Sequence, residues 1–324
     1  MPKLLVTGVG SNIGQGILKS LAAAGLDGDV VGTDVFQFAA GFAWCQAAYQ
    51  VPFANAPEYA PRLIDILRRH GTQLVLIGSE AETWELSKLK ARLERETSAK
   101  IVVNGPELIG RMSDKWGVAE LFREAGLNYP KSIIDMGKRR ELVAQLGYPL
   151  ILKPRRGWSA RAVQKIEDDE SLDFYAKHTP EPILQEYLEG DEFTCAVVFD
   201  RDGNYCDHVV MRRDLLSGTT FRAEIVARPD IDEYVVSFAR KLRAVASINL
   251  QLRVTKRGPV CFEINPRFSG TTAMRMKAGF NDVAAVVRNF LDGTPIGKQP
   301  AQRKRILRFW DEVVIEPDDP RFPK

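Results

Sequence analysis

The sequence is poor in the residues that build disulfide frameworks, zinc sites and catalytic triads. Its four cysteines are widely spaced and include no C-x-x-C pair, so neither a disulfide framework nor a zinc site is expected. None of its three histidines has a Ser, Cys or second His at motif spacing, which argues against triads and zinc hydrolases. We therefore expect four reduced thiols.

Two further absences limit the partners. No continuous apolar run reaches the roughly 18 residues that a membrane span requires, and the first residues lead directly into a strand and a Gly-rich turn instead of a signal peptide. The net charge of +3 is too small to indicate nucleic acid, and the basic triplet Arg303-Lys304-Arg305 would neutralise few phosphates. We expect a cytoplasmic protein that binds neither membrane nor nucleic acid.

What is present is the composition of a folded protein. Hydrophobic residues make up 45% of the chain and charged residues 27%, which excludes general disorder. The 324 residues suffice for two or three packed units, because single hydrophobic cores stop growing near about 250 to 300 residues.

The first hundred residues alternate short apolar runs with amphipathic stretches. Apolar runs at 4–7, 30–34, 74–77 and 101–103 predict strands, and the stretches 17–24, 59–70 and 85–95 predict helices. This alternation predicts a parallel sheet of about four strands with helices on both faces.

A dinucleotide-binding function is one reading of the N-terminal stretch. Asp34 ends the second strand, where such folds place the ligand of the ribose. The glycines at positions 8, 10 and 14 depart by one residue from G-x-G-x-x-G, however, and a lone match of this kind is weak. We therefore favour the interpretation that these glycines serve a tight strand-to-helix turn. An NAD(P)-dependent oxidoreductase stays an alternative.

The same end of the sheet offers candidate substrate residues. Gly10, Ser11 and Asn12 lead into the first helix, whose unpaired N–H groups could receive an anionic group of a substrate. Glu80 follows the carboxyl end of a later strand, where open α/β sheets bind ligands. A helix start that favours acidic residues explains Glu80 equally well.

The middle of the chain changes character after residue 105. Helices are predicted over 115–125 and 141–146. Lys153 ends an apolar strand and precedes a basic turn, where it could reach phosphates. Residues 183–194 read as strand, Gly turn and strand, a hinge whose backbone could pair with a purine edge while Glu192 accepts ribose hydroxyls. The polar stretch 215–220 could close over a substrate.

Two arginines flank that polar stretch. Arg212 and Arg222 could hold an acidic substrate, because guanidinium binds carboxylate in a bidentate manner. Surface ion pairs are an equally good reading of both residues.

A hairpin near the C-terminus is the strongest candidate for a metal site. Gln251 and Arg253 share one face of its first strand, and Glu263 and Asn265 share one face of its second, because side chains alternate along a strand. These oxygen ligands suit Mg²⁺ that is completed by phosphate, and Arg267 adds a cation beside them. The intervening apolar positions are expected to face a core; they are Leu252, Val254, Phe262 and Ile264.

Taken together and in this order, these motifs resemble the ATP-grasp superfamily, within it carbamoyl-phosphate synthase large-chain domains and the pyrrolysine-biosynthesis ligase. The resemblance covers the chain from its N-terminal unit to Gly293. It implies phosphate contacts by Lys115 and Lys153, an adenine-binding hinge at Gln185, Glu186, Tyr187 and Leu188, and a ribose ligand at Glu192. It further implies metal ligation by Gln251, Glu263 and Asn265, a catalytic role for Lys153 and Arg267, and a nucleotide contact from Arg161.

The fold implied by the resemblance combines α/β and α+β parts. A Rossmann-like parallel domain over 1–112 would precede a two-lobed ATP-grasp domain over 113–295, with a lid at about 113–187 and a larger antiparallel lobe at about 188–295. Residues 296–324 would form a C-terminal extension. Within these parts, 281–291 is expected to be a helix and 306–315 a strand.

The implied chemistry is ligation with ATP and Mg²⁺. A carboxylate, such as that of an amino acid, would be activated as an acyl phosphate and then coupled to an amine. Formation of carboxy or carbamoyl phosphate is an alternative. That activity normally needs a duplicated synthetase, and the single copy in this sequence argues against it. The partners are small-molecule carboxylates and amines, and a homodimer is allowed.

One loop departs from the family's pattern. Relatives carry several small residues over the phosphates, as in G-S-G-S-R-G-V, whereas residues 157–163 read G-W-S-A-R-A-V. Because glycine permits close approach of the backbone to phosphate, this loop calls the usual backbone cradle into question. Trp158 could pack instead on the substrate or on the closed lid.

Overall fold

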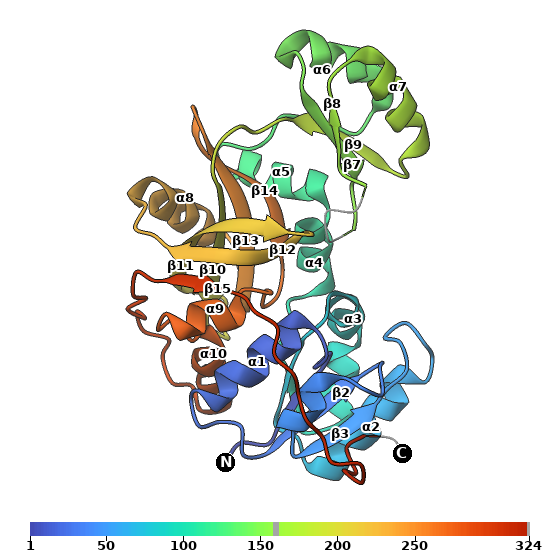
Figure 1. Ribbon diagram of the computed structural model, residues 1–324, viewed down its shortest axis with the longest axis vertical. Helices are drawn as coiled ribbons and strands as arrows, with labels where there is room; N and C mark the ends of the chain where they lie inside the picture. Colours follow the sequence, from blue (N-terminus) through green and yellow to red (C-terminus); the bar gives the residue numbers. More distant parts are fainter. Residues whose placement is uncertain (158–161, 323–324) are drawn as a thin grey trace.

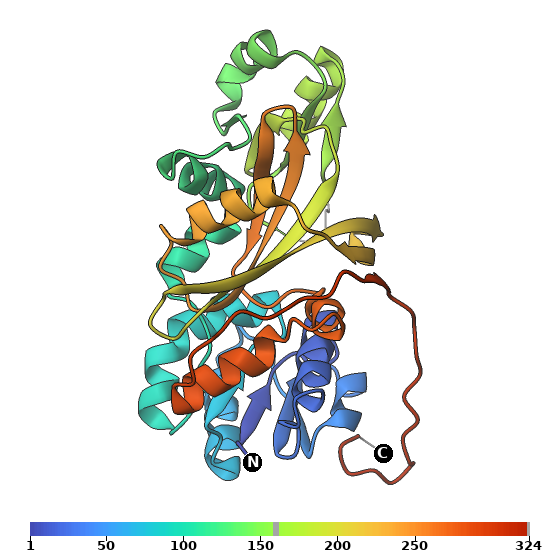
Figure 2. The same ribbon diagram turned by 90° about the vertical axis from the view of Figure 1, so that its left-hand side faces the viewer.

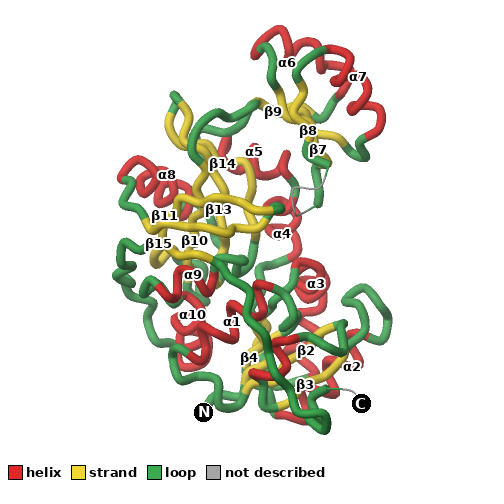
Figure 3. Tube along the Cα trace, viewed as in Figure 1, coloured by secondary structure: helices red, strands yellow, loops and turns green. Residues whose placement is uncertain are grey.

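The computed structural model describes residues 1–157 and 162–322. In this part of the chain the strands form three sheets, which lie one above another along the long axis of the molecule (Figures 1 and 3). The N-terminal sheet is at one end, the largest sheet lies in the middle and a small sheet is at the other end. Trp158 and Arg161, which the sequence singled out, lie outside the described residues.

The N-terminal sheet is parallel, as predicted, with the strand order β3-β2-β1-β4-β5. Its strands are β1 (Leu4–Val6), β2 (Val30–Asp34), β3 (Ala47–Gln50), β4 (Leu74–Leu76) and β5 (Lys100–Ile101). The described sheet has five strands where about four were expected. The additional strand, β3, is a half-exposed edge strand with the sequence AAYQ, which has none of the branched apolar residues that mark a buried strand.

Helices pack against both faces of this sheet. They are α1 (Asn12–Ala22), the 3₁₀ turn η1 (Ala40–Trp44), α2 (Tyr59–His70), α3 (Glu80–Glu96) and α4 (Pro106–Ser113). Helix α1 begins earlier than the expected residue 17, because the Ser11 side chain caps it by accepting from the amides of Ile13 and Gly14 at 3.1 and 2.9 Å. Gly14 therefore lies inside the helix, where a Cβ would be 2.2 Å from the Gly8 carbonyl oxygen.

The small sheet is antiparallel, with the strand order β6-β9-β7-β8. After α5 (Lys115–Glu124), the segment contains β6 (Ser132–Ile133), η2 (Met136–Lys138), α6 (Arg139–Leu146), β7 (Leu150–Pro154), β8 (Gln164–Ile166), α7 (Asp169–His178) and β9 (Pro182–Glu186). Helices α6 and α7 enclose a core of its own, made by Leu142, Leu150, Leu152, Ile166, Leu172 and Leu184. We call the segment 131–186 the lid.

The large sheet is antiparallel, with the strand order β14-β13-β10-β11-β12-β15. Its strands are β10 (Glu192–Phe199), β11 (Tyr205–Leu216), β12 (Thr219–Ile225), β13 (Ala246–Thr255), β14 (Gly258–Asn265) and β15 (Arg305–Leu307). The helices of this part are α8 (Pro229–Ala239), α9 (Thr272–Lys277) and α10 (Asp282–Asp292).

The two faces of the large sheet have different neighbours. One face is mostly apolar and packs on residues of α4, α5 and α8. On the other face, Ala196 and Val198 of β10 join the core that contains α1 and α10. Two and four residues earlier, the same face of β10 carries Thr194 and Glu192, which line a cavity. One end of this face thus builds a core and the other builds a site.

The C-terminal segment corrects a prediction. A strand was expected over 306–315, but only Arg305–Leu307 pairs with β12. Beyond it the chain runs along the outside of the molecule (Figure 2), and Trp310 is 85% exposed. The apolar residues of this stretch have no neighbouring strand among the described residues. The chain is anchored again at Arg321, which donates to the carbonyl oxygens of Ala43 and Cys45 at 2.9 and 3.1 Å.

None of the helices in the described ranges is long and apolar enough to cross a membrane.

Candidate functional site

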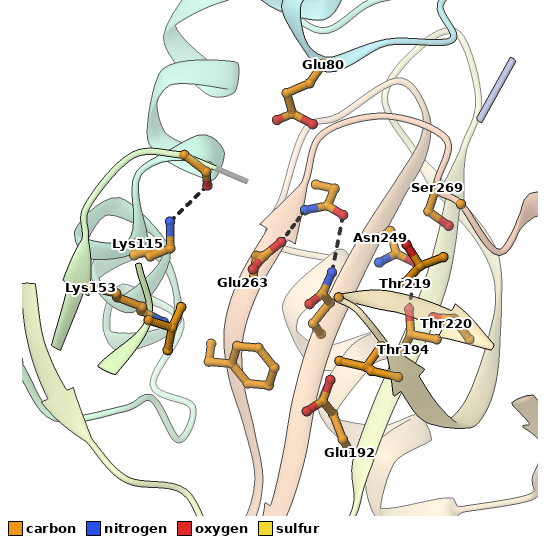
Figure 4. A pocket seen from close by; sticks show the side chains of 18 of the residues that line it. Glu80, Lys115, Lys153, Glu192, Thr194, Thr219, Thr220, Asn249, Glu263 and Ser269 are labelled. Carbon is orange, nitrogen blue, oxygen red and sulfur yellow. Dashed lines mark hydrogen bonds between the residues drawn. The ribbon is translucent and has the colours of Figure 1, made fainter. Parts of the chain in front are cut away.

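A cavity of about 850 Å³ lies where the three sheets meet. Most of the residues singled out in the sequence line it: Ser11, Asn12, Glu80, Lys115, Lys153, Gln185, Glu186, Tyr187, Leu188, Glu192, Gln251, Glu263, Asn265 and Arg267. Figure 4 shows the lysines Lys115 and Lys153 on one side of Glu263, and Thr194 and Asn249 on the other. The N-terminal domain, the lid and the large sheet therefore all contribute to one space.

The expected hairpin of β13 and β14 is confirmed. Gln251 pairs directly with Glu263, and Asn249 pairs with Asn265. The turn between the strands is short, because Thr255 already pairs with Gly258. This register places the amide and carboxylate groups of neighbouring strands side by side on the cavity face.

Phe262 corrects one detail of that hairpin. The alternation of side chains predicted that it would face a core, but the register shifts so that Gln251 pairs with Glu263 and Leu252 with Cys261. Phe262 is the extra residue of this bulge, and a bulge redirects a side chain. Its ring lines the cavity, with the Lys153 ammonium 5.7 Å from the ring centroid.

Glu263 is the carboxylate best placed to bind a cation. Its Oε1 accepts from the Asn265 amide at 2.8 Å, and the Gln251 amide donates to Asn265 Oδ1 at 3.4 Å. Among the described residues, no Lys, Arg or His nitrogen lies within 4.0 Å of the Glu263 carboxylate. No group of three or more His, Cys, Asp or Glu in the described ranges could hold a metal by itself. One carboxylate and one amide oxygen fit a Mg²⁺ ion whose other ligands come from phosphate or water.

The two lysines lie within the cavity wall. The Lys115 ammonium donates to the carbonyl oxygens of Arg155 and Gly157 at 3.3 and 3.1 Å, and burial lowers its pKa. The Lys153 side chain is buried at the end of β7, and desolvation together with the nearby charge of Lys115 lowers its pKa to about 8. Lys153 is thus a cation at neutral pH that is poorly solvated, a state that an anionic ligand would relieve.

The hinge between the lid and the large sheet also lines the cavity. The Gln185 amide donates to Ser132 Oγ at 2.9 Å. The Glu186 carboxylate accepts from Arg257 at 2.7 Å and from the Lys131 amide at 3.1 Å, so its charge is already compensated. Apolar side chains form a slot of the cavity beside the hinge: Pro130, Ile151, Leu188 and Phe262. Such a slot can hold a flat apolar ring.

Arg213 is a cavity residue that the sequence analysis missed. It donates to Glu192 Oε1 through Nε and Nη2 at 3.0 and 2.6 Å, and to Gln251 Oε1 through Nη2 at 2.7 Å. Arg253 donates to the other Glu192 oxygen at 2.9 Å. The signal that could have found Arg213 is alternation along β11, which places it and the preceding arginine on opposite faces.

An ion pair between two domains forms another wall of the cavity. Arg267, just after β14, donates through Nε to Glu80 Oε2 at 2.6 Å, and Glu80 begins α3 of the N-terminal domain. Ser11, at the start of α1, donates to the Gly78 carbonyl oxygen at 2.6 Å. Further hydroxyl groups line the cavity: Ser269 and Thr271, and Thr219 and Thr220 of the predicted polar stretch.

The remaining predicted residues lie elsewhere. Gly10 is not among the cavity residues, and its amide donates to Asp34 at 2.7 Å. Arg212 and Arg222 lie outside the cavity lining as well. The Arg212 side chain is half-exposed and lies near Glu224, and Arg222 pairs with Asp214 on the surface. Their proposed contact with a substrate stays a prediction.

The loop expected at 215–220 is a tight hairpin turn. Leu216 pairs with Thr219, so Ser217 and Gly218 alone form the turn, with φ values of 49° and 75°. Two consecutive residues with positive φ are the signature of a two-residue hairpin. The chain continues as paired strands to both sides, which leaves no free loop here to close over a substrate.

The dinucleotide alternative is not supported by the position of Asp34. Both of its carboxylate oxygens accept backbone amides, from Gly10 at 2.7 Å and from Phe36 at 3.0 Å. The side chain is buried, so it serves the turn after β1 and is not free to bind a ribose.

Comparison with known proteins agrees with this geometry. The family model described as ATP-grasp in the biosynthetic pathway with Ter operon matches residues 178–310. The carbamoyl phosphate synthase large chain of Rubrobacter xylanophilus is 24% identical over 93% of this chain, and that of Thermoanaerobacter pseudethanolicus is 24% identical over 86%. The chain spans only 31% and 28% of the length of these two relatives.

Solved structures share the fold over nearly the whole chain. N5-carboxyaminoimidazole synthetase from Staphylococcus aureus, complexed with ADP, has a TM-score of 0.72 at 16% identity and covers 94% of this chain and 80% of its own. The biotin carboxylase domain of 2-oxoglutarate carboxylase from Hydrogenobacter thermophilus has a TM-score of 0.72 at 16% identity, with 90% and 70% covered. The chain is therefore similar to ATP-grasp proteins: a family model of that group matches part of it, and solved structures of that kind share its fold.

Proposed function

We propose that this protein is an ATP-dependent carboxylate–amine ligase. It would activate a carboxylate, such as that of an amino acid, as an acyl phosphate and couple it to an amine, with release of ADP and phosphate. The observation that carries the proposal is the arrangement of Lys115, Lys153 and Glu263 in one cavity, together with apolar side chains beside the hinge. Two cations, a carboxylate that has no ion pair in the described part of the chain, and an apolar slot next to them suit a nucleotide and its phosphates.

The residues of the cavity would divide the work by position. The backbone of 185–188 and the apolar side chains beside it would hold the adenine, and Glu192 would accept ribose hydroxyls. Lys153 would neutralise charge on the phosphates from the lid, with Lys115 beside it, while Arg267 would steady the transferred group from the other side. Catalysis would then consist of positioning and charge stabilisation, with no protein nucleophile.

Glu263 and Asn265 would hold a Mg²⁺ ion, which supplies charge neutralisation between the phosphates when it is bound. The fit rests on the Glu263 carboxylate, which has no cationic partner within 4.0 Å in the described part of the chain. Gln251 faces the same two groups across the hairpin.

The substrates would enter on the side of the N-terminal domain. The ion pair of Glu80 and Arg267 and the hydroxyl groups of Ser11, Ser269 and Thr271 line this side. These groups can bind a small polar acid. We therefore place the carboxylate between Arg267 and the end of the phosphates, and the amine beside it.

Formation of carboxy or carbamoyl phosphate is the second candidate. It is favoured by the similarity to carbamoyl phosphate synthase large chains. It predicts ATP turnover that depends on bicarbonate and on no other carboxylate. A homodimer stays a prediction for either activity.

Nucleotide turnover tests the proposal. Purified protein with Mg²⁺ and ATP would be screened against amino acids, other carboxylates and bicarbonate, with hydroxylamine as a trap, and ADP, AMP and hydroxamate would be measured. We expect ADP and hydroxamate with one class of acid, and loss of both in Glu263→Gln. Glu233→Gln, an exposed carboxylate on α8, is the matched control and should keep activity. AMP in place of ADP would contradict the acyl phosphate.

A further inference from the structure

Arg213 is a nearly buried cation in the wall of the cavity. It projects from β11 into the cavity, and only 8% of its side chain is exposed. Its guanidinium engages Glu192, Gln251 and, through Nη1 at 3.4 Å, the hydroxyl of Thr220. Three elements thus fix one cation within the wall of the cavity.

The contact with Gln251 decides what else can bind there. Gln251 Oε1, the oxygen that a metal ion would use, already accepts from Arg213 Nη2 at 2.7 Å. The Gln251 amide nitrogen donates towards Asn265, which fixes the orientation of the whole group. A divalent cation on Gln251 Oε1 would therefore lie beside a guanidinium, and the two positive charges would repel each other in a poorly solvated site.

Few carboxylates near Gln251 are available to bind a second metal ion. Glu192 is compensated by two arginines, Arg213 and Arg253, at 2.6 and 2.9 Å. Glu263 is the carboxylate that stays without an ion pair among the described lining residues. A pair of metal ions would need shared carboxylate ligands on both sides, whereas one carboxylate suits one ion.

We propose that this site takes a single divalent cation, held by Glu263 and Asn265, and that the Arg213 guanidinium stands where a second cation would bind beside the nucleotide phosphates. An arginine has five N–H donors. Four of them are used by Glu192, Gln251 and Thr220, and one on Nη1 is left for a phosphate oxygen. This inference rests on the proposed function, and it adds the Arg213 guanidinium to the groups that would bind the nucleotide phosphates.

The number of bound Mn²⁺ ions tests the inference directly. Mn²⁺ would be titrated by electron paramagnetic resonance into the full-length protein with saturating β,γ-imido-ATP, with nucleotide alone as the blank. We expect one bound Mn²⁺ per chain in the wild type. Two bound Mn²⁺ ions would overturn the inference, even if ATP turnover shows that the ligase proposal is right. If the wild type binds no nucleotide, both proposals fail.

Variants of Arg213 supply the second readout. Removing the guanidinium in Arg213→Met should weaken nucleotide binding by about tenfold or more and should free Gln251, which permits a second Mn²⁺ ion. Arg213→Lys should recover part of the affinity, because it restores a cation. Arg240→Met, an exposed position after α8, is the matched control and should change neither readout. Unchanged affinity in a folded Arg213→Met protein would overturn the role of Arg213, and circular dichroism establishes that the variant is folded.

Discussion

Lys153 is a residue whose charge depends strongly on its place in the fold. Burial and the neighbouring Lys115 lower its pKa from the ordinary 10.5 to about 8. A bound phosphate favours the protonated form, so nucleotide affinity should be constant below about pH 8. Above that pH the affinity should fall by up to about tenfold per pH unit. Titration of nucleotide binding by calorimetry between pH 6.5 and 9.5, values chosen to bracket about one and a half units around that pKa, measures this.

Lys153→Arg separates this effect from general alkaline damage. Arginine stays charged throughout this range, so the variant should lose the steep fall in affinity. The stability of the nucleotide-free protein should change in the opposite direction. The unfolded chain binds the Lys153 proton up to its ordinary pKa, so this group's contribution to the free energy of unfolding rises from pH 8 to 10.5. Identical pH profiles for wild type and variant would show that Lys153 is not the group responsible.

For single residues, the sequence predicted which residue types form the site better than it predicted where their side chains point. Alternation along the two strands of the hairpin correctly placed Gln251, Glu263 and Asn265 on the face that lines the cavity. It failed for Phe262, because a bulge shifts the register within the same hairpin and leaves no mark in the sequence. Arg212 was named because it flanks the polar stretch 215–220, whereas Arg213 is the arginine of β11 that lines the cavity. Both arginines flank the same turn, and only the position of β11 in the sheet shows which of them points inward.

At the scale of elements, a buried ion pair holds the turn that follows β14. Arg275 of α9 and Asp282 of α10 are both fully buried, and Nη2 of Arg275 donates to Asp282 at 2.7 Å. The same guanidinium donates to the hydroxyls of Ser269 and Thr271 at 2.9 and 3.2 Å. Both hydroxyl residues line the cavity, so the pair supports from behind the side of the cavity where we propose that the substrates bind.

Replacing one partner of this pair should lower the free energy of unfolding much more than replacing both partners with apolar residues. Asp282→Asn leaves the Arg275 charge buried without a counterion and should lower the free energy of unfolding by about 3–5 kcal/mol. Arg275→Met with Asp282→Leu should recover part of this loss, because no buried charge is left. Urea unfolding measures both, with Asp311→Asn in the exposed C-terminal segment as the control, expected within about 0.5 kcal/mol of wild type. A loss below about 1 kcal/mol in Asp282→Asn would contradict this view of the pair.

The helices and strands with the most regular apolar pattern were the ones that the sequence predicted best. The helix at 59–70 was predicted at its exact bounds, since its apolar spacing is regular and Gly71 ends it with φ of 58°. The edge strand β3 was missed because AAYQ carries no apolar alternation. The strand expected at 306–315 was too long, because apolar residues alone do not make a strand without a partner edge.

At the scale of the molecule, the N-terminal domain and the large lobe are joined by many direct contacts. Asn104 exchanges two hydrogen bonds with the backbone of Val245, at 2.8 and 3.3 Å. Lys100 donates to the Phe290 carbonyl oxygen at 2.8 Å, and a common apolar core crosses the boundary. The sequence predicted both parts but not these joints, because they bring together residues more than a hundred positions apart.

The lid should behave as a separate, less stable unit. Its described core has only six buried apolar residues, so opening the lid exposes little apolar surface and costs less free energy than opening the large lobe. In hydrogen exchange without nucleotide, we expect peptides over β7 and β9 to exchange faster than peptides over β10 and β13. Equal protection of the two sets would show that the lid unfolds only with the whole molecule.

A bound nucleotide should then slow hydrogen exchange in the lid more than in the rest of the molecule. A ligand that contacts Lys153 and the hinge on one side and Glu263 on the other binds the closed lid and not the open one, so it stabilises the lid by its own binding free energy. With Mg²⁺ and ADP, we expect protection to increase over β7, β9 and residues 185–188 and to change little over α2, which is remote from the cavity. Glu263→Gln should reduce this gain while leaving the nucleotide-free exchange pattern as it is. A gain in protection that is the same in Glu263→Gln would mean that the nucleotide closes the lid without the metal, and it would place the metal site outside the coupling between the two lobes.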